Sequence, residues 1–367
     1  MPAREALAAL LRGEAEGWRH WRDRPVSDLV GLAATHGVLA LLADLVEPAG
    51  EDCPPPLHDA LRAEFRRHLA ADLVREHELR RLVAAFAAAG VRSLLMKGAD
   101  VAYGAYPRPE LRSRTDTDLL VAPSARAAAT AVLVALDYEL VPQSGGDLLM
   151  YQEPFRLLRD GRVAHVVDLH WRVFNPQRYG TSLSFDHLDG AAEPRPSLAT
   201  AARGSSTAHA LALACVHRVA HHFDQDRLIW LYDVRVLAAK MRDDDWSRFA
   251  HVVTTNGLQI PCIRSLDAAR RDLDADIPDA VFETLRAAGG GEADAAFLDP
   301  RSPHALRILS DFRHVRGWTG RIRLARQHLF PPASYMRTVY APASAAPLWA
   351  LYLRRIVQGS RRWLVRS

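Results

Sequence analysis

The chain has 367 residues, of which 49% are hydrophobic and 25% are charged, and this is the composition of a soluble globular protein with two or three packed units. Its three cysteines are widely spaced and form no Cys-x-x-Cys pair, which argues against a disulfide framework and a thiolate zinc site. No apolar run reaches the roughly 18 residues that span a bilayer, and acidic residues come too early for a secretion signal, so we expect a cytoplasmic protein.

The net charge of +4 is unevenly distributed along the chain. Residues 301–367 contain 13 arginines and a single acid, Asp311, which gives this tail a charge of +12 and leaves −8 for the rest. Such a tail is typical of a solvated helical surface or of a segment with an anionic partner. Its last stretch, 348–367, combines tryptophans with arginines and predicts a helix that docks on the protein itself or makes peripheral contact with an anionic membrane.

The first 90 residues predict helices. Prolines 54–56 separate an early pair of helices from a long one over 57–90, which ends at Gly90 as a C-cap. The period then changes, because the apolar run 91–96 is bounded by glycines and predicts a buried strand. The turn Lys97-Gly98 follows this strand and opens a predicted helix over 99–106.

Mixed structure continues to residue 171. We expect a strand over 115–121, a helix over 125–136 with Ser124 as its N-cap, and strands over 138–141, 148–158 and 162–171. Asp160-Gly161 indicates a hairpin between the last two strands. Long helices return over 205–290, and the basic tail predicts two more around prolines 331–332.

The predicted fold class is therefore α+β and helix-rich, with a small mixed sheet flanked by helical domains. The predicted division is an N-terminal helical region (1–74), an α/β core (75–190), a C-terminal helical domain (200–290) and an Arg-rich helical tail (301–367).

Three aspartates in the predicted core point to chemistry. Asp116 and Asp118 are two residues apart, so on a strand their carboxylates share one face. Like charges so placed repel each other unless a cation lies between them, and Mg²⁺ accepts one or two carboxylates together with substrate phosphates. Asp168, on another predicted strand, would complete a two-metal site if that strand lies alongside. A solvated strand edge is the alternative.

The segment before the acid pair is suited to phosphate. Gly98 lets backbone amides at a helix N-terminus approach an anion. Arg108, Arg112 and Arg114 lie between this turn and the carboxylates and carry guanidinium groups that match phosphate oxygens.

The run LLMKGADVAYGAYPRPELRSRTDTDLLV resembles the signature of the uncharacterised bacterial nucleotidyltransferases of the DNA polymerase beta superfamily, and VDLHW and HALALACVHRVAHHFDQDRLIWLYDVRVLA fit the same pattern. The resemblance implies Mg²⁺ carboxylates at Asp116 and Asp118, with Asp168 as the third acid, which helps to activate the attacking hydroxyl. It further implies a nucleotide-binding turn at Gly98 and an arginine that faces the triphosphate at Arg112.

One position departs from the wider superfamily. The usual Gly-Ser turn is Gly98-Ala99 here, so the hydroxyl that touches the outer phosphates is missing, and Lys97 is the residue that we expect to compensate. His170 shares the face of Asp168 and is placed with the nucleotide-binding residues, where it would orient that acid, contact the acceptor or act in proton transfer. The alternative is a histidine that satisfies a hydrogen bond beneath the site.

A histidine cluster follows in the C-terminal domain. His217 and His221 are four residues apart on one helical face, which permits a transition metal, hydrogen bonds across helices or to Asp224 or Asp233, or a wall of the nucleotide cleft. Of these, hydrogen bonding is favoured over metal binding.

Together these features predict a Mg²⁺-dependent nucleotidyltransferase that transfers NMP from an NTP to a small molecule, a peptide natural product or a protein. A biosynthetic tailoring role fits the resemblance. The alternative is a non-catalytic nucleotide-binding or partner-binding protein on the same fold. Nucleic acid is the less favoured acceptor, because the core shows no module of stacking aromatic residues.

Overall fold

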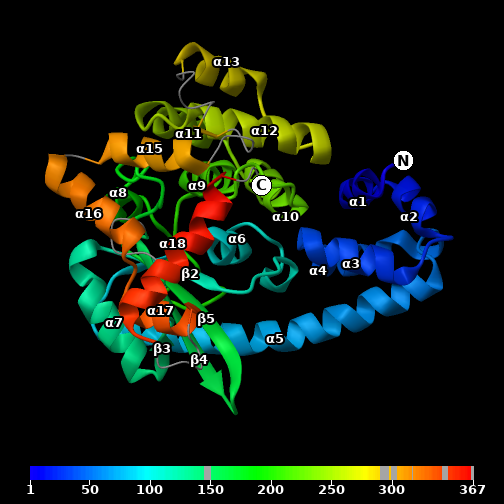
Figure 1. The fold of residues 1–367 in the computed structure, drawn as a ribbon. Helices are drawn as coiled ribbons and strands as arrows, with labels where there is room; N and C mark the ends of the chain where they lie inside the picture. Colours follow the sequence, from blue (N-terminus) through cyan, green and yellow to red (C-terminus); the bar gives the residue numbers. More distant parts are fainter. Residues whose placement is uncertain (144–149, 290–296, 299–303, 316, 341–345, 365–367) are drawn as a thin grey trace.

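The structure is a computed structural model, which describes residues 1–367 apart from 144–149, 290–296, 299–303, 316, 341–345 and 365–367. These described residues form a helix-rich α+β fold around one mixed sheet (Figure 1). The predicted fold class is therefore confirmed.

Four helices, not two, precede the long helix: α1 (Ala3–Arg12), α2 (Ala15–Trp21), α3 (Val26–His36) and α4 (Leu39–Ala49). The long helix α5 (Pro55–Ala88) begins after Pro54 and runs along the bottom of the molecule in Figure 1, from the other N-terminal helices to the sheet. It ends where Gly90 takes a φ of 69°, as the predicted glycine C-cap requires. Because α5 spans residue 74, the N-terminal helices and the core share this element.

In the described part of the chain the sheet has seven strands, in the order β3-β4-β5-β2-β1-β7-β6. The bounds are β1 (Ser93–Met96), β2 (Thr117–Val121), β3 (Tyr138–Leu140), β4 (Gln152–Arg159), β5 (Arg162–His170), β6 (Glu193–Pro194) and β7 (Arg203–Gly204). The predicted hairpin is confirmed between β4 and β5, where Asp160 and Gly161 have φ values of 51° and 73°. Residues 148–149 of the predicted fourth strand lie outside the described residues.

Two short helices flank the first strands. Helix α6 (Lys97–Gly104) begins at Lys97, two residues earlier than expected. Helix α7 (Arg126–Ala135) begins after the 3-10 turn η3 (Pro123–Ala125), and its N-cap is Ala125 with no side-chain hydrogen bond. The prediction of Ser124 as the cap was therefore wrong, because the turn η3 occupies that position.

The two short strands β6 and β7 were not predicted. A buried ion pair helps to hold β7 beside α6: Arg195 donates from Nε to Asp100 Oδ1 at 2.9 Å, and the Ser205 amide donates to the other oxygen at 3.0 Å. Burial raises the pKa of Asp100 to about 6. Gly204 is required here, because a Cβ at this position would lie 1.8 Å from Asp100 Oδ1.

The central strands separate an apolar face from a polar one. Strand β2 runs parallel to β5, with Asp118 directly opposite Asp168. The alternate residues, among them Leu119 and Leu169, are fully buried in a core with α5 and α7. Because side chains alternate along a strand, the aspartates lie on the opposite face of the sheet.

A second core joins the two ends of the fold. Side chains of α1–α4, such as Leu7 and Leu42, belong to the same buried cluster as Val216 and Phe249 of the C-terminal helices. Those helices are α9 (Thr207–Val216), the π-helical turn η4 (His217–His221), α10 (Leu228–Ala238), α11 (Asp243–Thr255), α12 (Gln259–Leu273) and α13 (Asp279–Ala287), and the short α8 (Phe185–Gly190) precedes them.

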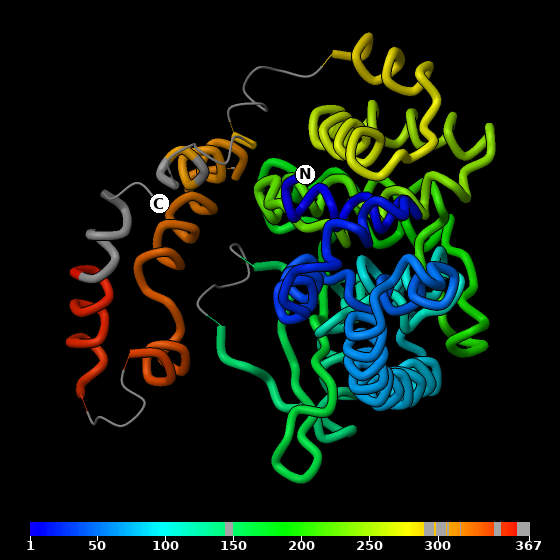
Figure 2. Tube along the Cα trace, turned by 90° about the vertical axis from the view of Figure 1, so that its right-hand side faces the viewer, coloured from blue at the N-terminus to red at the C-terminus, as the bar shows by residue number. Residues whose placement is uncertain are grey.

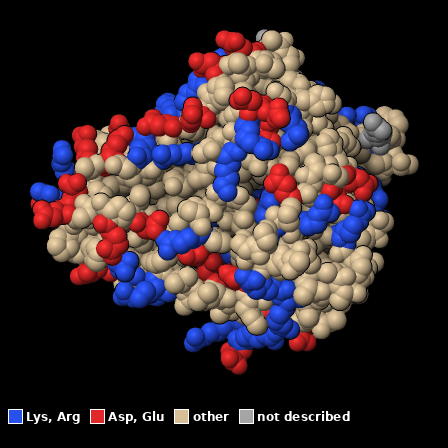
Figure 3. Space-filling model, turned by 180° about the vertical axis from the view of Figure 1, so that it is seen from behind, with Lys and Arg blue, Asp and Glu red and all other residues tan. Residues whose placement is uncertain are grey.

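The described residues of the basic tail form four helices instead of the expected two: α15 (His304–His314), α16 (Gly317–Leu329), α17 (Ala333–Tyr340) and α18 (Leu348–Leu364). They form a layer along one side of the molecule (Figure 2). Helix α18 buries Leu351 but leaves Trp349 69% exposed, so its docking covers only part of its apolar surface. On the face shown in Figure 3, basic and acidic side chains are interspersed.

None of the described helices is both long enough and apolar enough to cross a bilayer.

Candidate active site

A cleft of about 620 Å³ opens on the polar face of the sheet. The N-terminal helices, the β1–α6 turn, the segment before β2, the ends of β4 and β5, and the turn before α10 all contribute to its walls. Of the sequence-predicted residues, His170 and Arg108 are not among those that line the cleft. The lining includes Lys97, Gly98, Arg112, Arg114, Asp116, Asp118, Asp168, His217 and His221.

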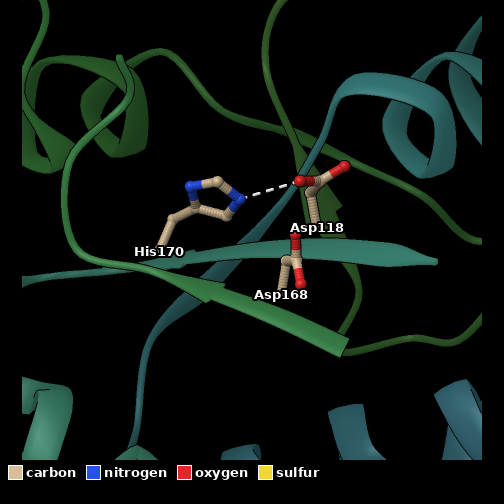
Figure 4. A group of neighbouring side chains, drawn as sticks. All are labelled: Asp118, Asp168 and His170. Carbon is tan, nitrogen blue, oxygen red and sulfur yellow. Dashed lines mark hydrogen bonds and ion pairs between the residues drawn. The ribbon is translucent and has the colours of Figure 1, made fainter. Parts of the chain in front are cut away.

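The carboxylates meet as the strand order requires. Asp118 and Asp168 are register partners on β2 and β5, and His170 extends from the same face of β5 (Figure 4). One potential ligand atom from each of these three residues lies within 4.8 Å of the other two. Asp116 also lines the cleft but lies just before β2 and outside this group. The described residues therefore bring His170, rather than Asp116, to the two facing aspartates.

Asp118 has two cationic or polar partners. Lys97 Nζ lies 2.5 Å from Asp118 Oδ1, and His170 Nε2 lies 2.7 Å from the same oxygen. Burial by itself would raise the pKa of Asp118, but the Lys97 ammonium and the His170 hydrogen bond outweigh it and hold this pKa far below its usual value. Burial and Lys97 together lower the pKa of His170 to about 4, so its ring is neutral at pH 7. His170 thus contacts Asp118 and not Asp168, the acid that it was expected to orient.

Asp168 has the opposite electrostatic environment. Burial and the carboxylates of Asp118 and Asp116 raise its pKa to about 7, and its neighbour Gln152 donates a hydrogen bond to Oδ2. The pKa of Asp116 is also raised, first by burial and then by Asp118. The cleft therefore holds one carboxylate, Asp118, that is stabilised as an anion, and two others whose pKa values are raised by burial and by the charge of Asp118.

The β1–α6 turn brings backbone strain to the site. Lys97 has a φ of 50°, a left-handed conformation that non-glycine residues rarely adopt and that often marks functional sites. Gly98 follows in the first turn of α6, whose free amides can receive an anion. A Cβ at Gly98 would lie 3.2 Å from Arg112 Nη1, so the guanidinium of Arg112 packs closely over this glycine.

Arg112 has a protein partner that the sequence did not suggest. Its Nε and Nη2 donate to the two carboxylate oxygens of Asp233 on α10, each at 2.7 Å, and both side chains are buried. Tyr106 adds a hydrogen bond from its hydroxyl to Asp233 Oδ1 at 2.9 Å. Because Nε and Nη2 of Arg112 both donate to Asp233, the expected contact with a triphosphate would have to use other N–H groups of this side chain.

The neighbouring arginines are also engaged with the fold. Arg114 Nη2 lies 3.0 Å from Asp72 Oδ1 on α5, with both side chains almost fully buried. Arg108 pairs with Asp44 on α4 at the surface. These two side chains therefore attach the segment before β2 to the N-terminal helices.

The histidines form a wall of the cleft. His217 and His221 lie in η4, and such π-helical turns occur often at functional sites. His217 Nε2 lies 3.2 Å from His222 Nε2, and the His222 ring stacks on Trp230 at 4.2 Å. Burial lowers the pKa of His217 and His221 well below the usual value, so both rings are neutral.

The predicted carboxylate partners of these histidines were wrong. Asp224 pairs with Arg218 and Arg264, at 2.7 and 2.5 Å, and Asp233 pairs with Arg112. Among the described residues, the histidines of this cluster do not form part of a potential metal-ligand group.

Several cleft residues escaped the sequence analysis, among them Gln152, Asn175, Arg227 and Trp230. Gln152 is the register partner of His170 across β4 and β5, and Asn175 donates from Nδ2 to Gln152 Oε1 at 3.2 Å. A signal for Gln152 existed, because a hairpin centred on Asp160-Gly161 brings its first strand beside the residues that follow Asp168.

Comparison with known proteins agrees with this geometry. Residues 23–273 match the model of a protein family described as uncharacterised nucleotidyltransferases. The chain belongs to this family. The match ends before the basic tail and includes every cleft residue named above. A comparison with curated proteins gives no match.

Proposed function

We propose that this nucleotidyltransferase moves NMP from an NTP to an acceptor and releases pyrophosphate, with Mg²⁺ held by its aspartates. The observation that carries the proposal is the pairing of Asp118 with Asp168 across parallel strands, beside the Lys97-Gly98 turn in one cleft. Membership of the nucleotidyltransferase family supports the class of reaction.

The donor set fits a hard divalent cation. Asp118 and Asp168 place carboxylate oxygens within 4.8 Å of one another, and Asp116 adds a third carboxylate to the same cleft. A cation would relieve the repulsion that raises the pKa values of Asp168 and Asp116. When bound, Mg²⁺ supplies Lewis-acid stabilisation of the charge that develops on phosphate oxygens.

The side chains of the cleft then have distinct tasks. Asp116 and Asp118 hold the cation, and His170 fixes the orientation of Asp118. The carboxylate of Asp168 accepts the proton of the attacking acceptor hydroxyl, whose oxygen forms the new bond to the α-phosphorus as the bond to pyrophosphate breaks. The amides around Gly98 and the ammonium of Lys97 position the phosphates.

The acceptor is proposed as a small molecule, a peptide natural product or a protein side chain, within a biosynthetic tailoring pathway. Candidate acceptors are incubated with Mg²⁺ and an NTP labelled either at the α-phosphate or at the γ-phosphate. We expect the α-label in the acceptor product and the γ-label in pyrophosphate.

The matched controls are Asp116→Asn and a reaction with EDTA, both of which should remove the product. A γ-labelled acceptor would replace NMP transfer with phosphoryl transfer. Tight NTP binding with no transfer to any acceptor, in the wild type as in Asp116→Asn, would favour the non-catalytic alternative.

A further inference from the structure

Arg227 is a cleft residue to which none of the preceding roles applies. It lies at the N-cap of α10, directly before Leu228, and lines the cleft together with Ile229 and Trp230. Its backbone is extended, with a φ of −131°, and it follows a bend in which Phe223 and Asp224 have positive φ values. An unusual backbone path therefore brings this arginine to the cleft wall.

The other basic cleft residues with permanently charged side chains all have carboxylate partners. They are Lys97 with Asp118, Arg112 with Asp233, and both Arg75 and Arg114 with Asp72. Among the described residues, Arg227 has no such partner. Its guanidinium lies over the Trp230 ring at 5.1 Å, and its Nε is buried without a hydrogen-bond acceptor.

A half-buried guanidinium without an anion is an incomplete site. Water solvates the group only in part, and the ring of Trp230 replaces a carboxylate weakly. Burial and the nearby charge of Arg112 both lower the pKa of Arg227, so the two guanidinium groups repel each other across the cleft wall. An anion between them would relieve this repulsion and satisfy the open donors.

Neighbouring residues leave room for this arginine to present its donors to the cleft. Gly37, at the end of α3, has a φ of 72°, and a Cβ there would lie 3.2 Å from Arg227 Nη2. On the other side, Arg112 packs over Gly98 at the start of α6. Gly98, Arg112 and Arg227 are thus linked by successive contacts or electrostatic coupling, beginning at the turn that receives phosphate.

We propose that Arg227 binds the outer phosphates of the nucleoside triphosphate. The proposal rests on the proposed function for the identity of the anion. In the family resemblance the triphosphate arginine corresponds to Arg112, but here two N–H groups of Arg112 donate to Asp233. Within the part of the chain that the structure describes, the cleft guanidinium without a carboxylate partner is that of Arg227. Arg227 is then a substrate-binding residue supplied by the C-terminal helices.

Calorimetric titration of the full chain in Mg²⁺ tests this assignment with three probes: a non-hydrolysable NTP analogue, inorganic triphosphate and the corresponding NMP. Arg227→Gln should lower the affinity for the analogue and for triphosphate by about 10-fold or more, the usual effect of losing a charge-assisted hydrogen bond. It should leave the affinity for NMP within about twofold of the wild type. The triphosphate affinity of Arg227→Lys should lie between those of the wild type and Arg227→Gln, because lysine keeps the charge.

Arg235→Gln is the matched control, since Arg235 lies on the same helix and contacts Tyr232 and the Leu11 carbonyl rather than the cleft. Unchanged triphosphate affinity in Arg227→Gln would overturn the proposal, and so would an equal loss for NMP and NTP, which a purely structural role predicts. A wild type that binds neither triphosphate probe would also overturn it. Because the readout is binding, failure of NMP transfer leaves this outcome separately measurable.

Discussion

A histidine has different surroundings on the two faces of the central sheet. On β5, His165 points into the apolar core with α5 and α7, whereas His170 belongs to the cleft face. His165 lies between two neutral hydroxyl groups, with Thr117 Oγ1 at 2.9 Å and Tyr138 Oη at 2.6 Å. His170 instead contacts the carboxylate of Asp118, with the Lys97 ammonium 3.4 Å from its Nε2.

Both rings are held neutral by burial, yet the charges of their hydrogen-bond partners differ. Burial lowers the pKa of His165 to about 3, and it has only uncharged hydrogen-bond partners. Around His170 the structure places charges of both signs in close contact, the Asp118 carboxylate and the Lys97 ammonium. Burial therefore does not distinguish the two histidines, whereas the charge of their partners does.

The largest difference in the effects of substitution, on NMP transfer and on stability, is expected between the adjacent residues Asp168 and Leu169. Asp168→Asn should lower NMP transfer by at least about 100-fold, since even indirect partners of a metal ligand contribute 10–100-fold. Its melting temperature should stay the same or rise, because one of three repelling carboxylates is neutralised. Leu169→Ala should instead lower stability by about 2–5 kcal/mol in urea unfolding, with kcat of the folded protein retained.

A result in which Asp168→Asn unfolds the protein, or in which Leu169→Ala removes activity at full stability, would erase the distinction between the two faces.

Substitution of the two histidines should show the same contrast between activity and stability, with smaller effects. His170→Phe keeps a ring of similar size but removes the hydrogen bond to Asp118, and we expect about 10–100-fold slower transfer. His165→Phe leaves two buried hydroxyls without their partner and should lower stability by about 1–3 kcal/mol. Steady-state kinetics and urea unfolding of both variants measure the pair, and equal kinetic effects would contradict the comparison.

The smallest expected effect is the pH dependence of stability. Below pH 6.5 the unfolded chain protonates His165 while the folded chain does not until about pH 3, so the free energy of unfolding falls on acidification. This group contributes a loss of roughly 1 kcal/mol for each pH unit in that window. Urea unfolding of the wild type and His165→Phe at pH 7.0 and 5.5 isolates the term, and parallel losses in both would exclude it.

Much of the site was accessible from local patterns. The alternation of TDTDLLV and the apolar run before Lys97-Gly98 predicted the strands that carry Asp118 and precede the turn, and the Asp160-Gly161 signal predicted the hairpin that contains Asp168. These are short-range regularities of strand period and turn chemistry. The predicted placement of β5 alongside β2 followed from the chemistry that three carboxylates require.

The remainder depends on partners far apart in the chain. Arg112 is separated from Asp233 by 121 positions, and Asp100 from Arg195 by 95, so no local pattern announces either pair. The start of α6 at Lys97 also escaped prediction, because a lysine with a positive φ is disfavoured intrinsically and is imposed by its surroundings. Arg112 was expected to be available to phosphate because its partner Asp233 is so distant in the sequence.

The distant partner of Arg112 also constrains how this chain acquires its structure during synthesis. A growing polypeptide that has emerged only as far as β5 already carries all three cleft aspartates and Arg112, but it lacks α10 and therefore Asp233. It likewise lacks the helices that share a core with α1–α4. Because contacts of such long sequence separation form late, Arg112 gains its partner, and the cleft its last wall, only when α10 arrives.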